Sequence, residues 1–526
     1  MEVDPALALE IATLARQRTL NEVTASNQSS IQKYYAGKNV FVTGGTGFIG
    51  KQLIEKLLRA CPDINKIYVL ARPKKEKTVQ QRAAELTDDQ LYNGVKKSDP
   101  DFAKKIVVVA GNITELGLGL SENDTQQIID EVNIFFHVAA TTRFDEPLKT
   151  AVLTNVRATR EIVLLASKCK NISSFLHVST AFTHCPLPNV EEKFYPSPMP
   201  YEVIIDLVES TDVERLDGIT EKLIKPWPNT YTFTKAIAED VIQRLAEKLP
   251  AAIVRPAIVA ATYKEPAPGW LDISSIFGPS AVIAGSGTGV MHCFLADKAC
   301  KVDLVPADFV NNACITAAYK AAVNYEAGDT ESRIYTCTSS VRNSITWGSI
   351  SDICNGYCRW MISPRAVWYC FNVIQANRLI HLLLTFLWHT IPGLLIDSAV
   401  MLVGNKPRYR KLYNKMYKLN ELLSYFCLQE WVFDDTNMKN LHKSLSEVDK
   451  QIFQFDIESL DWKEYIQIWY LGIRRYIIKD DLKNTKVGAN RQKYFKIGHY
   501  IVVGLYCYIF YYIMQTMYSV VMWMSK

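Results

Sequence analysis

Short apolar runs rich in β-branched residues alternate with amphipathic stretches over the first half of the chain. The stretches between the runs have the spacing of helices. Helices usually connect parallel strands, because the chain must cross back over the sheet before it can start the next strand. The alternation continues to Pro256 and predicts an α/β fold with a doubly wound parallel sheet. The apolar runs occupy residues 38–43, 66–71, 105–113, 134–140 and 174–181.

The last apolar stretch is long enough to cross a bilayer. From Ile501 to Met524 about two dozen residues are apolar or aromatic, with Gln515 in the interior. Five basic residues between 483 and 496 precede this stretch and only Lys526 follows it, so the positive-inside rule keeps the preceding domain in the cytosol. The pattern predicts a transmembrane tail anchor at residues 497–524, and a buried core helix is the alternative.

An earlier apolar run at residues 379–403 has the length to span but carries ionisable groups, among them His381, His389 and Asp397. Each such group costs a few kcal/mol at the centre of a bilayer, by an order-of-magnitude estimate. A true span would also move the following residues across the membrane, away from the active site that they help to form. We therefore expect a monotopic or re-entrant element that dips into the membrane interface.

Composition narrows the function classes. Hydrophobic residues make up 48% of the chain and the net charge is +5 over 526 residues, which favours an apolar ligand or a bilayer contact and predicts no nucleic-acid partner. The twelve cysteines form no Cys-x-x-Cys pair, so we expect reduced, buried thiols and no metal site. The acidic start of the chain is not a secretory signal, and residues 1–36 are predicted to be a polar extension.

The first apolar run leads into a glycine-rich turn and then into a helix over Lys51–Arg59. The spacing Gly44-x-x-Gly47-x-x-Gly50 suits a dinucleotide. Gly44 permits a tight turn, Gly47 lets the backbone approach a pyrophosphate, and Gly50 permits close packing of helix on strand. The turn predicts a Rossmann sheet. Its expected cofactor-binding residues are Thr43, Gly44, Gly45, Thr46, Gly47, Phe48, Ile49 and Gly50.

The second run ends at Arg72, with Lys74 and Lys75 close behind. Sites selective for NAD carry an acidic residue here for the ribose hydroxyls, whereas cations suit a 2′-phosphate, so the sequence predicts NADPH. A solvated basic loop is the alternative. Further along, Asn112 and Ile113 are expected beside the adenine, and the cofactor is expected to pass close to Ala139.

Tyr231 and Lys235 lie one turn apart on one face of a helix that is predicted to continue to Lys248. A phenol has a pKa near 10, and a neighbouring ammonium is expected to lower the pKa of Tyr231 towards neutrality, which suits acid–base chemistry. The same lysine can hold the nicotinamide ribose. Ser179 and Thr180 end the fifth run, where ligands bind in open α/β sheets. We expect Thr180 to bind the reacting carbonyl oxygen, with Ser179 as the second candidate.

Together these motifs resemble the extended short-chain dehydrogenase/reductase superfamily. Blocks such as Lys264-Glu-Pro-Ala-Pro-Gly-Trp270 and Gly285-Ser-Gly-Thr-Gly-Val290 narrow the resemblance to the animal and insect fatty acyl-CoA reductases, and Gly472-Ile-Arg-Arg-Tyr476 resembles their C-terminal male-sterility domain. Asn112 departs from the Asp that such sequences commonly carry. The resemblance implies an NADPH-binding reductase domain at 37–350 and a mainly helical male-sterility domain at 351–490.

The resemblance implies that a long-chain acyl-CoA is reduced through an aldehyde to the primary alcohol, with release of CoA, for lipid, wax or ether-lipid synthesis. It also implies a peroxisomal or endoplasmic reticulum membrane. Whether the chain forms a homo-oligomer stays open. Two alternatives also remain: a membrane-bound extended reductase acting on a sterol or other lipid carbonyl, and a non-catalytic binding protein that keeps the fold.

A long acyl chain needs an apolar path from the reacting carbon to the bilayer. Burial stabilises a chain by about 0.8 kcal/mol per methylene. The segment 353–430 is rich in aromatic and aliphatic residues, including Trp360, Trp368, Phe371, Leu382–Leu384 and Phe386. We hypothesise that it lies over the substrate side of the sheet and forms a tunnel. An ordinary core between helices is the alternative interpretation.

Overall fold

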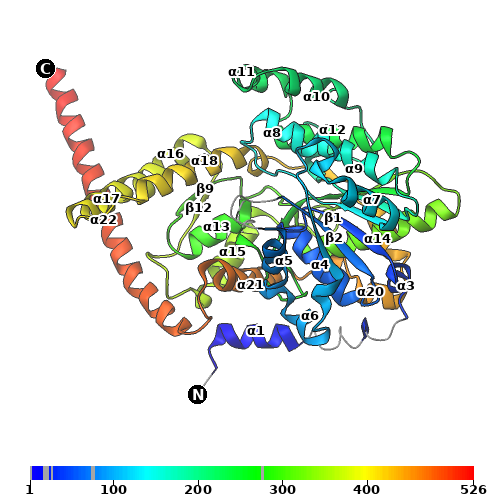
Figure 1. The fold of residues 1–526 in the computed structure, drawn as a ribbon. Helices are drawn as coiled ribbons and strands as arrows, with labels where there is room; N and C mark the ends of the chain where they lie inside the picture. The colour runs from blue at the N-terminus through cyan, green and yellow to red at the C-terminus, as the bar shows by residue number, and fades with distance from the viewer. Residues whose placement is uncertain are drawn as a thin grey trace.

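The computed structural model describes residues 3–15, 23–24, 28–72, 78–273, 276 and 278–525. Its centre is a seven-stranded sheet in which every pair of neighbouring strands is parallel, in the order β11-β7-β5-β4-β1-β2-β3 (Figure 1). This order confirms the doubly wound sheet. The strands are β1 Asn39–Thr43, β2 Lys66–Ala71, β3 Ile106–Ala110, β4 Ile134–His137, β5 Ser174–Val178, β7 Ala251–Pro256 and β11 Arg333–Cys337.

Successive side chains of each strand serve two different cores. In β1, Val40 and Val42 pack with the helices of one face, whereas Phe41 between them packs with the helices of the other. The first face is covered by α4 (Phe48–Ala60) and α14 (Ala307–Glu326), which lie against each other, and α14 also lies against β5 and β7. The second face is covered by α7 Glu122–Glu131, α9 Ala158–Ala166 and α12 Thr230–Leu245.

Smaller elements surround this sandwich. The shorter helices of the first half are α1 Pro5–Ala15, α3 Ser30–Tyr35, α5 Val79–Thr87, α6 Asn93–Ser98, α8 Leu148–Val152, α10 Tyr201–Ser210, α11 Val213–Leu223 and α13 Gly278–Gly287. In the second half the helices are α15 Trp347–Gly356, α16 Arg378–Thr385, α17 Ile391–Leu402, α18 Tyr409–Cys427, α19 Thr436–Lys443, α20 Glu447–Ile452, α21 Trp462–Gly472 and α22 Thr485–Met524.

Three two-stranded parallel sheets complete the fold, and two of them join the halves of the chain. β12 (Val373–Gln375) pairs with β9 (Cys293–Leu295), and β13 (Val432–Phe433) pairs with β6 (Asn189–Val190). The third sheet, β8 with β10, lies wholly before the sequence boundary proposed near residue 350. The C-terminal region is therefore attached to the first half by backbone pairing as well as by side chains. β8 spans Ile258–Ala260 and β10 spans Leu304–Pro306.

Several element ends differ from those that the sequence predicts. The strands predicted to reach residues 113, 140 and 181 end at Ala110, His137 and Val178, about three residues earlier. Beyond these points the backbone leaves the ladder and opens the edge of the sheet, which apolar patterns alone do not signal. The helix predicted over Lys51–Arg59 already begins at Phe48, and α12 ends at Leu245 instead of Lys248.

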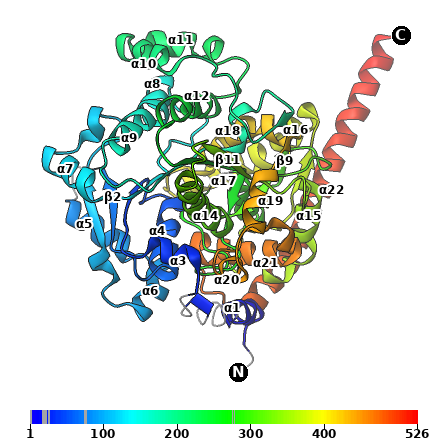
Figure 2. The same cartoon turned by 90° about the vertical axis from the view of Figure 1, so that its right-hand side faces the viewer.

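Two helical stretches have the length and apolar character to cross a membrane, Arg378–Leu402 and Thr485–Met524. The second is α22, whose apolar half contains the predicted anchor and extends away from the rest of the molecule, as Figure 2 shows from a second side. The first consists of α16, a short π-helical turn at Phe386–Thr390, and α17, and it lies along α18.

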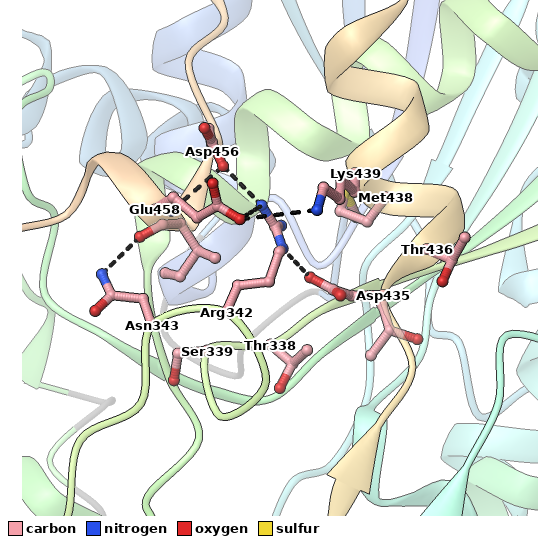
Figure 3. A network of polar contacts seen from close by, with 12 residues as sticks. Thr338, Ser339, Arg342, Asn343, Asp435, Thr436, Met438, Lys439, Asp456 and Glu458 are labelled. Atoms are coloured by element: carbon pink, nitrogen blue, oxygen red, sulfur yellow. Dashed lines mark hydrogen bonds and ion pairs between the residues drawn. The ribbon is translucent and has the colours of Figure 1, made fainter.

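A buried ionic network fastens the two halves near the edge strand β11 (Figure 3). Arg342 donates from Nε to Asp435 at 2.5 Å and from Nη1 to Asp456 at 2.7 Å, and Glu458 lies 3.7 Å from the same Nη1. The next residue, Asn343, donates to the carbonyl oxygens of Ile457 and Leu460. Burial raises the pKa of Asp435, and the hydrogen bond and charge of the arginine oppose that rise. The guanidinium of Arg342 therefore neutralises the buried carboxylate of Asp435.

We predict that Arg342→Leu destabilises the protein by about 3 kcal/mol, because it leaves the carboxylate of Asp435 buried without a counter-charge. Arg215→Leu is the matched control. The side chain of Arg215 is 83% exposed in its pair with Asp212, and its loss should change the stability by less than about 0.5 kcal/mol. Thermal denaturation of both full-length variants checks this, and equal shifts in the two would contradict it.

Candidate active site at the carboxyl edge of the sheet

The glycine turn is held at van der Waals distance from the next strand. Gly44 has a φ of +73°, and a Cβ built on it would lie 2.7 Å from the backbone nitrogen of Ala139, just beyond β4. A Cβ on Gly50 would lie 2.8 Å from the carbonyl carbon of Gly44 and would overlap its oxygen. Two of the three glycine roles expected from the sequence thus have a direct steric cause, the tight turn and the close helix packing.

The amino end of α4 lies at the glycine turn. Its N-cap is Gly47, which has no side chain to bond the first amide groups of the helix. Such a terminus offers oriented N–H groups and a positive dipole to a phosphate. The next residue, Phe48, stacks on Trp270 at 5.4 Å, and the carbonyl oxygen of Ile49 accepts from Asn311. The residues present therefore fit a pyrophosphate at this helix end.

The side chain of Thr43 connects β1 to the end of β4. Its hydroxyl is fully buried, lies 2.8 Å from Nδ1 of His137, and accepts from the backbone N–H of Ala139 at 3.3 Å. The register places Thr43 beside His137 and His137 beside His177 across three neighbouring strands. Thr43 thus holds the end of β4 against the glycine turn, and Ala139 is placed beside Gly44, where a larger side chain would crowd the turn.

A polar pocket lies beside the glycine turn at the end of β2. Arg72 lines it together with Thr46 and Lys51 of the turn and α4, and with Arg82 of α5. Lys51 is held there by ion pairs to Asp89 and Asp272 at 2.9 and 2.8 Å. Lys74 and Lys75 lie outside the described residues. Glu85 of α5 also lines it, so three cations and one carboxylate surround this hollow, and of the cations Arg72 was expected from the sequence.

Arg82 and Lys51 were missed because neither belongs to a recognised motif. One signal was available in the sequence. Thr78 and Gln81 form a capping box, which starts α5 directly after the basic loop and turns Arg82 in its first turn towards the edge of the sheet.

The two residues expected beside the adenine follow β3. The side chain of Asn112 accepts from the backbone and the hydroxyl of Thr114 and donates to Glu115 at 2.9 Å, so it shapes the turn after the strand. Ile113 is half-buried and packs with the second core. Both lie at the edge of the sheet that carries the glycine turn, and their contact with a cofactor stays a prediction.

Tyr231 and Thr180 come together from two elements. Asn229 caps α12 by accepting from the backbone N–H of Thr232, which places Tyr231 in the first turn, with its phenol beside the hydroxyl of Thr180 at the end of β5. Burial raises the pKa of Tyr231 to about 12, against the opposing effect of the Thr180 hydroxyl. The expected lowering of this pKa is therefore wrong for this geometry. The phenol is protonated at neutral pH, which is the state that a proton donor needs.

Lys235 explains the difference, because its ammonium does not face the phenol. It donates to the carbonyl oxygen of Val178 at 2.7 Å and lies 3.1 Å from Nε2 of His177. Burial lowers the pKa of Lys235 to about 7, and the carboxylate of Glu239 opposes that effect. The lysine is on the same helix face as Tyr231, as predicted, but it points into the end of β5.

Ser179 has a different partner from Thr180. Its hydroxyl donates to Glu239 at 2.6 Å, and Glu239 is paired with Arg255, whose side chain is fully buried. The charge of Arg255 holds the pKa of Glu239 below its usual range in spite of burial. This arrangement favours Thr180, the first choice from the sequence, as the hydroxyl beside Tyr231, and gives Ser179 a supporting place under α12.

Aromatic residues from both halves of the chain pack around Tyr231 and the end of β5. Phe144 stacks on Tyr231 at 6.1 Å, and Phe426 near the end of α18 contacts both Phe144 and Phe182 at 5.2 and 5.3 Å. Trp431 donates from its indole N–H to the carbonyl oxygen of Cys185 and packs on Phe182. The segment 353–430 was predicted to lie on this side of the sheet, and α18, the last helix of that segment, does lie there. Phe144, Phe182 and Trp431 were not predicted.

Two family models match the chain, both described as male sterility protein. The first, of the NAD-binding type, covers residues 42–314, and the second covers residues 388–480. Fatty acyl-CoA reductase wat of Drosophila melanogaster is 38% identical over 91% of this chain and 92% of its own length. Two human proteins, fatty acyl-CoA reductase 1 and fatty acyl-CoA reductase 2, are 39% and 35% identical over 86% and 90% of this chain and over 87% and 91% of their own lengths.

Two solved structures share the fold. The terminal R domain from the myxalamid PKS-NRPS biosynthetic pathway has a TM-score of 0.54 at 18% identity and covers 84% of this chain and 91% of that one. A reductase (R) domain of a non-ribosomal peptide synthetase from Mycobacterium tuberculosis has a TM-score of 0.53 at 17% identity, over 89% and 98% of the two chains. At these identities the likeness establishes the architecture alone.

We predict that Gly44→Ala lowers both stability and dinucleotide affinity, because the new Cβ would meet Ala139 and the backbone needs a positive φ. The conformational strain costs about 1–3 kcal/mol. Gly218→Ala is the control, since this glycine lies inside α11 with nothing within 4 Å, and alanine there should stabilise the helix slightly. Thermal denaturation and cofactor titration measure both effects. Unchanged binding by Gly44→Ala would remove the turn from the cofactor site.

Proposed function

The chain belongs to the fatty acyl-CoA reductase family, and from that membership and its site we propose that it reduces long-chain fatty acyl-CoA to the primary fatty alcohol with NADPH. Two successive reductions use two NADPH and two protons, release CoA, and pass through the aldehyde. The observation that carries the proposal is the protonated Tyr231 beside Thr180 at the sheet edge that also holds the glycine turn.

The matched domain is of the NAD(P)-binding type, and the choice of NADPH is part of the proposal. The amino end of α4 and the glycine turn would hold the pyrophosphate. Arg72 and Arg82 would hold the 2′-phosphate, because two guanidinium groups beside one hollow suit a dianion. Lys51 is already neutralised by two carboxylates, so we assign it to shaping the pocket.

Bound NADPH supplies a hydride to the carbonyl carbon. In the first reduction Thr180 and Tyr231 would stabilise the negative charge on the thioester oxygen while the carbon–sulfur bond breaks and the thiolate leaves. In the second reduction Tyr231 would donate its proton to the aldehyde oxygen, which becomes the alcohol. The raised pKa of Tyr231 keeps that proton available. Lys235, whose ammonium bonds the carbonyl oxygen of Val178, would hold the end of β5 in place beside Thr180.

The path of the acyl chain differs from the tunnel that the sequence suggested. Leu382, Leu383 and Phe386 lie on the outer surface, so that part of the tunnel hypothesis is wrong. An apolar cavity forms instead between α13, α15, α21 and the strand β12. We propose this cavity for the distal acyl chain, because its wall at Phe371 contacts Trp388 and His499, next to the membrane helix. The cavity is lined by Val282, Ile283, Phe294, Ile350, Ile362 and Phe371, among others.

We propose that α22 is the single C-terminal membrane anchor and that the reductase domain faces the cytosol, on a peroxisomal or endoplasmic reticulum membrane. The apolar half of α22 is exposed to its end, and the basic residues Lys486, Arg491, Lys493 and Lys496 precede it.

Incubation with radiolabelled acyl-CoA of several chain lengths and NADPH, followed by chromatography of the products, tests the reaction itself. The expected products are a primary alcohol and free CoA. A secondary alcohol made from a ketone, without any use of acyl-CoA, would instead indicate the sterol-type reductase.

We predict that Tyr231→Phe lowers the turnover about a hundred- to ten-thousand-fold, because it removes the proton donor. NADPH affinity should stay nearly unchanged. Ser179→Ala is a comparison variant on the neighbouring hydroxyl, which bonds Glu239 rather than Tyr231, and it should lose much less activity. Steady-state kinetics and cofactor titration measure the two quantities separately. Turnover that survives in Tyr231→Phe would refute the mechanism.

We predict that Arg72→Asp and Arg82→Asp each reduce the preference for NADPH over NADH, by about ten- to a hundredfold, because each removes a charged hydrogen bond. The matched control is Arg215→Asp on α11, which should leave the preference unchanged. The measurement is the ratio of kcat/KM for the two cofactors. If neither pocket variant changes that ratio, the 2′-phosphate is bound elsewhere.

A further inference from the structure

The segment formed by α16, the turn Phe386–Thr390 and α17, here called the arm, has two chemically different sides. Three of its ionisable residues face the protein: His381, His389 and Asp397 are at most 4% exposed. The fourth, Arg378 at the start of the arm, is exposed and pairs with Glu421 of α18. Its outer side is apolar and has no protein partner in the described part of the chain. Six of its large apolar side chains are more than half exposed: Leu379, Leu383, Phe386, Leu395, Met401 and Leu402, and Val403 directly after the arm is exposed as well.

The arm returns to the side of the molecule from which it left. It begins after β12, which pairs with β9 of the reductase half, and it ends in α18, whose Phe426 reaches the active site. Asp397 fastens α17 to α18 by accepting backbone N–H groups of Arg408, Tyr409 and Arg410. A span would have its two ends on opposite sides of the membrane, so this path favours an arm that stays on one side, although its length would allow a span.

The arm crosses α22 beyond Lys496, the last charged residue of that helix. Tyr506 donates to the carbonyl oxygen of Leu387 at 2.8 Å, and Trp388 packs on both His499 and Tyr506. From Tyr506 to the end of α22 the helix rises about 27 Å, close to the thickness of a hydrocarbon core. The crossing therefore lies at the near boundary of that core, and Figure 1 shows the arm lying across α22 at this level.

Basic residues continue from the arm onto α18. Between Gly404 and Asn420 the chain carries six basic residues and no acidic one. All six side chains are exposed, and they start directly after the apolar tip at Leu402 and Val403. A surface that changes from apolar to basic over a few residues matches the change from acyl chains to anionic headgroups.

We propose that the arm is a second membrane contact, with its apolar side inserted among the acyl chains of the cytosolic leaflet and the basic residues of α18 on anionic headgroups. Three observations favour a bilayer over a second copy of this chain as the occupant. The apolar side is continuous with α22, and it lies at the level where α22 would enter the hydrocarbon. The exposed side chains that border it on α18 are basic, and these like charges would repel a second copy.

The test uses the full-length protein in vesicles of phosphatidylcholine and phosphatidylserine that contain a phospholipid with a diazirine in its acyl chain. After irradiation, mass spectrometry locates the cross-links. We expect them on α22 and on outward residues of the arm, such as Leu395 and Leu402. Val213 and Ile219 on α11, which are exposed apolar residues away from the arm, serve as the internal control and should stay unlabelled. Cross-links confined to α22 would overturn the proposal.

A charge-reversal variant tests the basic border. Lys406→Glu, Arg410→Glu and Lys411→Glu together should lower the cross-link yield on the arm several-fold in phosphatidylserine vesicles and leave it unchanged in pure phosphatidylcholine. The matched control reverses Lys97, Lys104 and Lys222, which are exposed elsewhere, and should match the parent protein. An equal loss in both lipids, or with the control, would contradict a headgroup contact.

The two other arrangements give distinct results. If the segment spans, a cysteine introduced at Asn405 would react with a membrane-impermeant maleimide only after the vesicles are opened. The arm predicts reaction in sealed vesicles, on the side of the reductase domain. If a second copy covers the arm, the lipid probe would leave the arm unlabelled, and a separate protein cross-linking reagent would join arm to arm. Either result would overturn the proposal.

Discussion

The position of the whole site depends on the close approach of three backbone segments at the carboxyl edge of the sheet. Gly44, Gly50 and Ala139 lie so near one another that a Cβ on either glycine would overlap its neighbour. This contact sets how far α4 enters the sheet and where its open amino end points. It is reinforced from below by the buried Thr43 hydroxyl on His137. This contact also positions the rest of the site, because β4 pairs with β5. Thr180 follows the end of β5, and Lys235 donates to the last residue of that strand.

The same edge explains the electrostatics of the catalytic pair. Parallel strands buried on both faces leave no water for a charged side chain, so burial moves the pKa of Lys235 down and that of Tyr231 up. Glu239 lies one turn beyond Lys235 and carries a full ion pair with Arg255, which keeps one negative charge in this core. The site therefore holds a neutral phenol as the candidate proton donor, while the ammonium of Lys235 bonds the end of β5.

The sequence was sufficient for the parts of this site that local rules determine. The sheet, the glycine turn and the Tyr231–Lys235 spacing follow from periodicity and from steric needs that act within a few residues. The misses are contacts between distant segments. Nothing near Lys235 in the sequence indicates that its ammonium bonds the end of β5, and nothing near Phe426 indicates that it lies on Phe144. The arm was half predicted: its ionisable residues argued against a span, but only the packing shows that His381, His389 and Asp397 face inward.

The helix α18 connects the proposed membrane contact to the chemistry. It has 19 residues and so a length of about 28 Å. Asp397 fixes its amino end to the arm, and its carboxyl end places Tyr425 and Phe426 against Cys185, Phe182 and Phe144. A helix fixed at both ends transmits position as a rigid rod. Under the proposed docking the bilayer surface therefore lies at a set distance from Tyr231. An acyl chain that leaves the leaflet would then meet the site at one defined depth, which a flexible tether at α22 alone could not achieve.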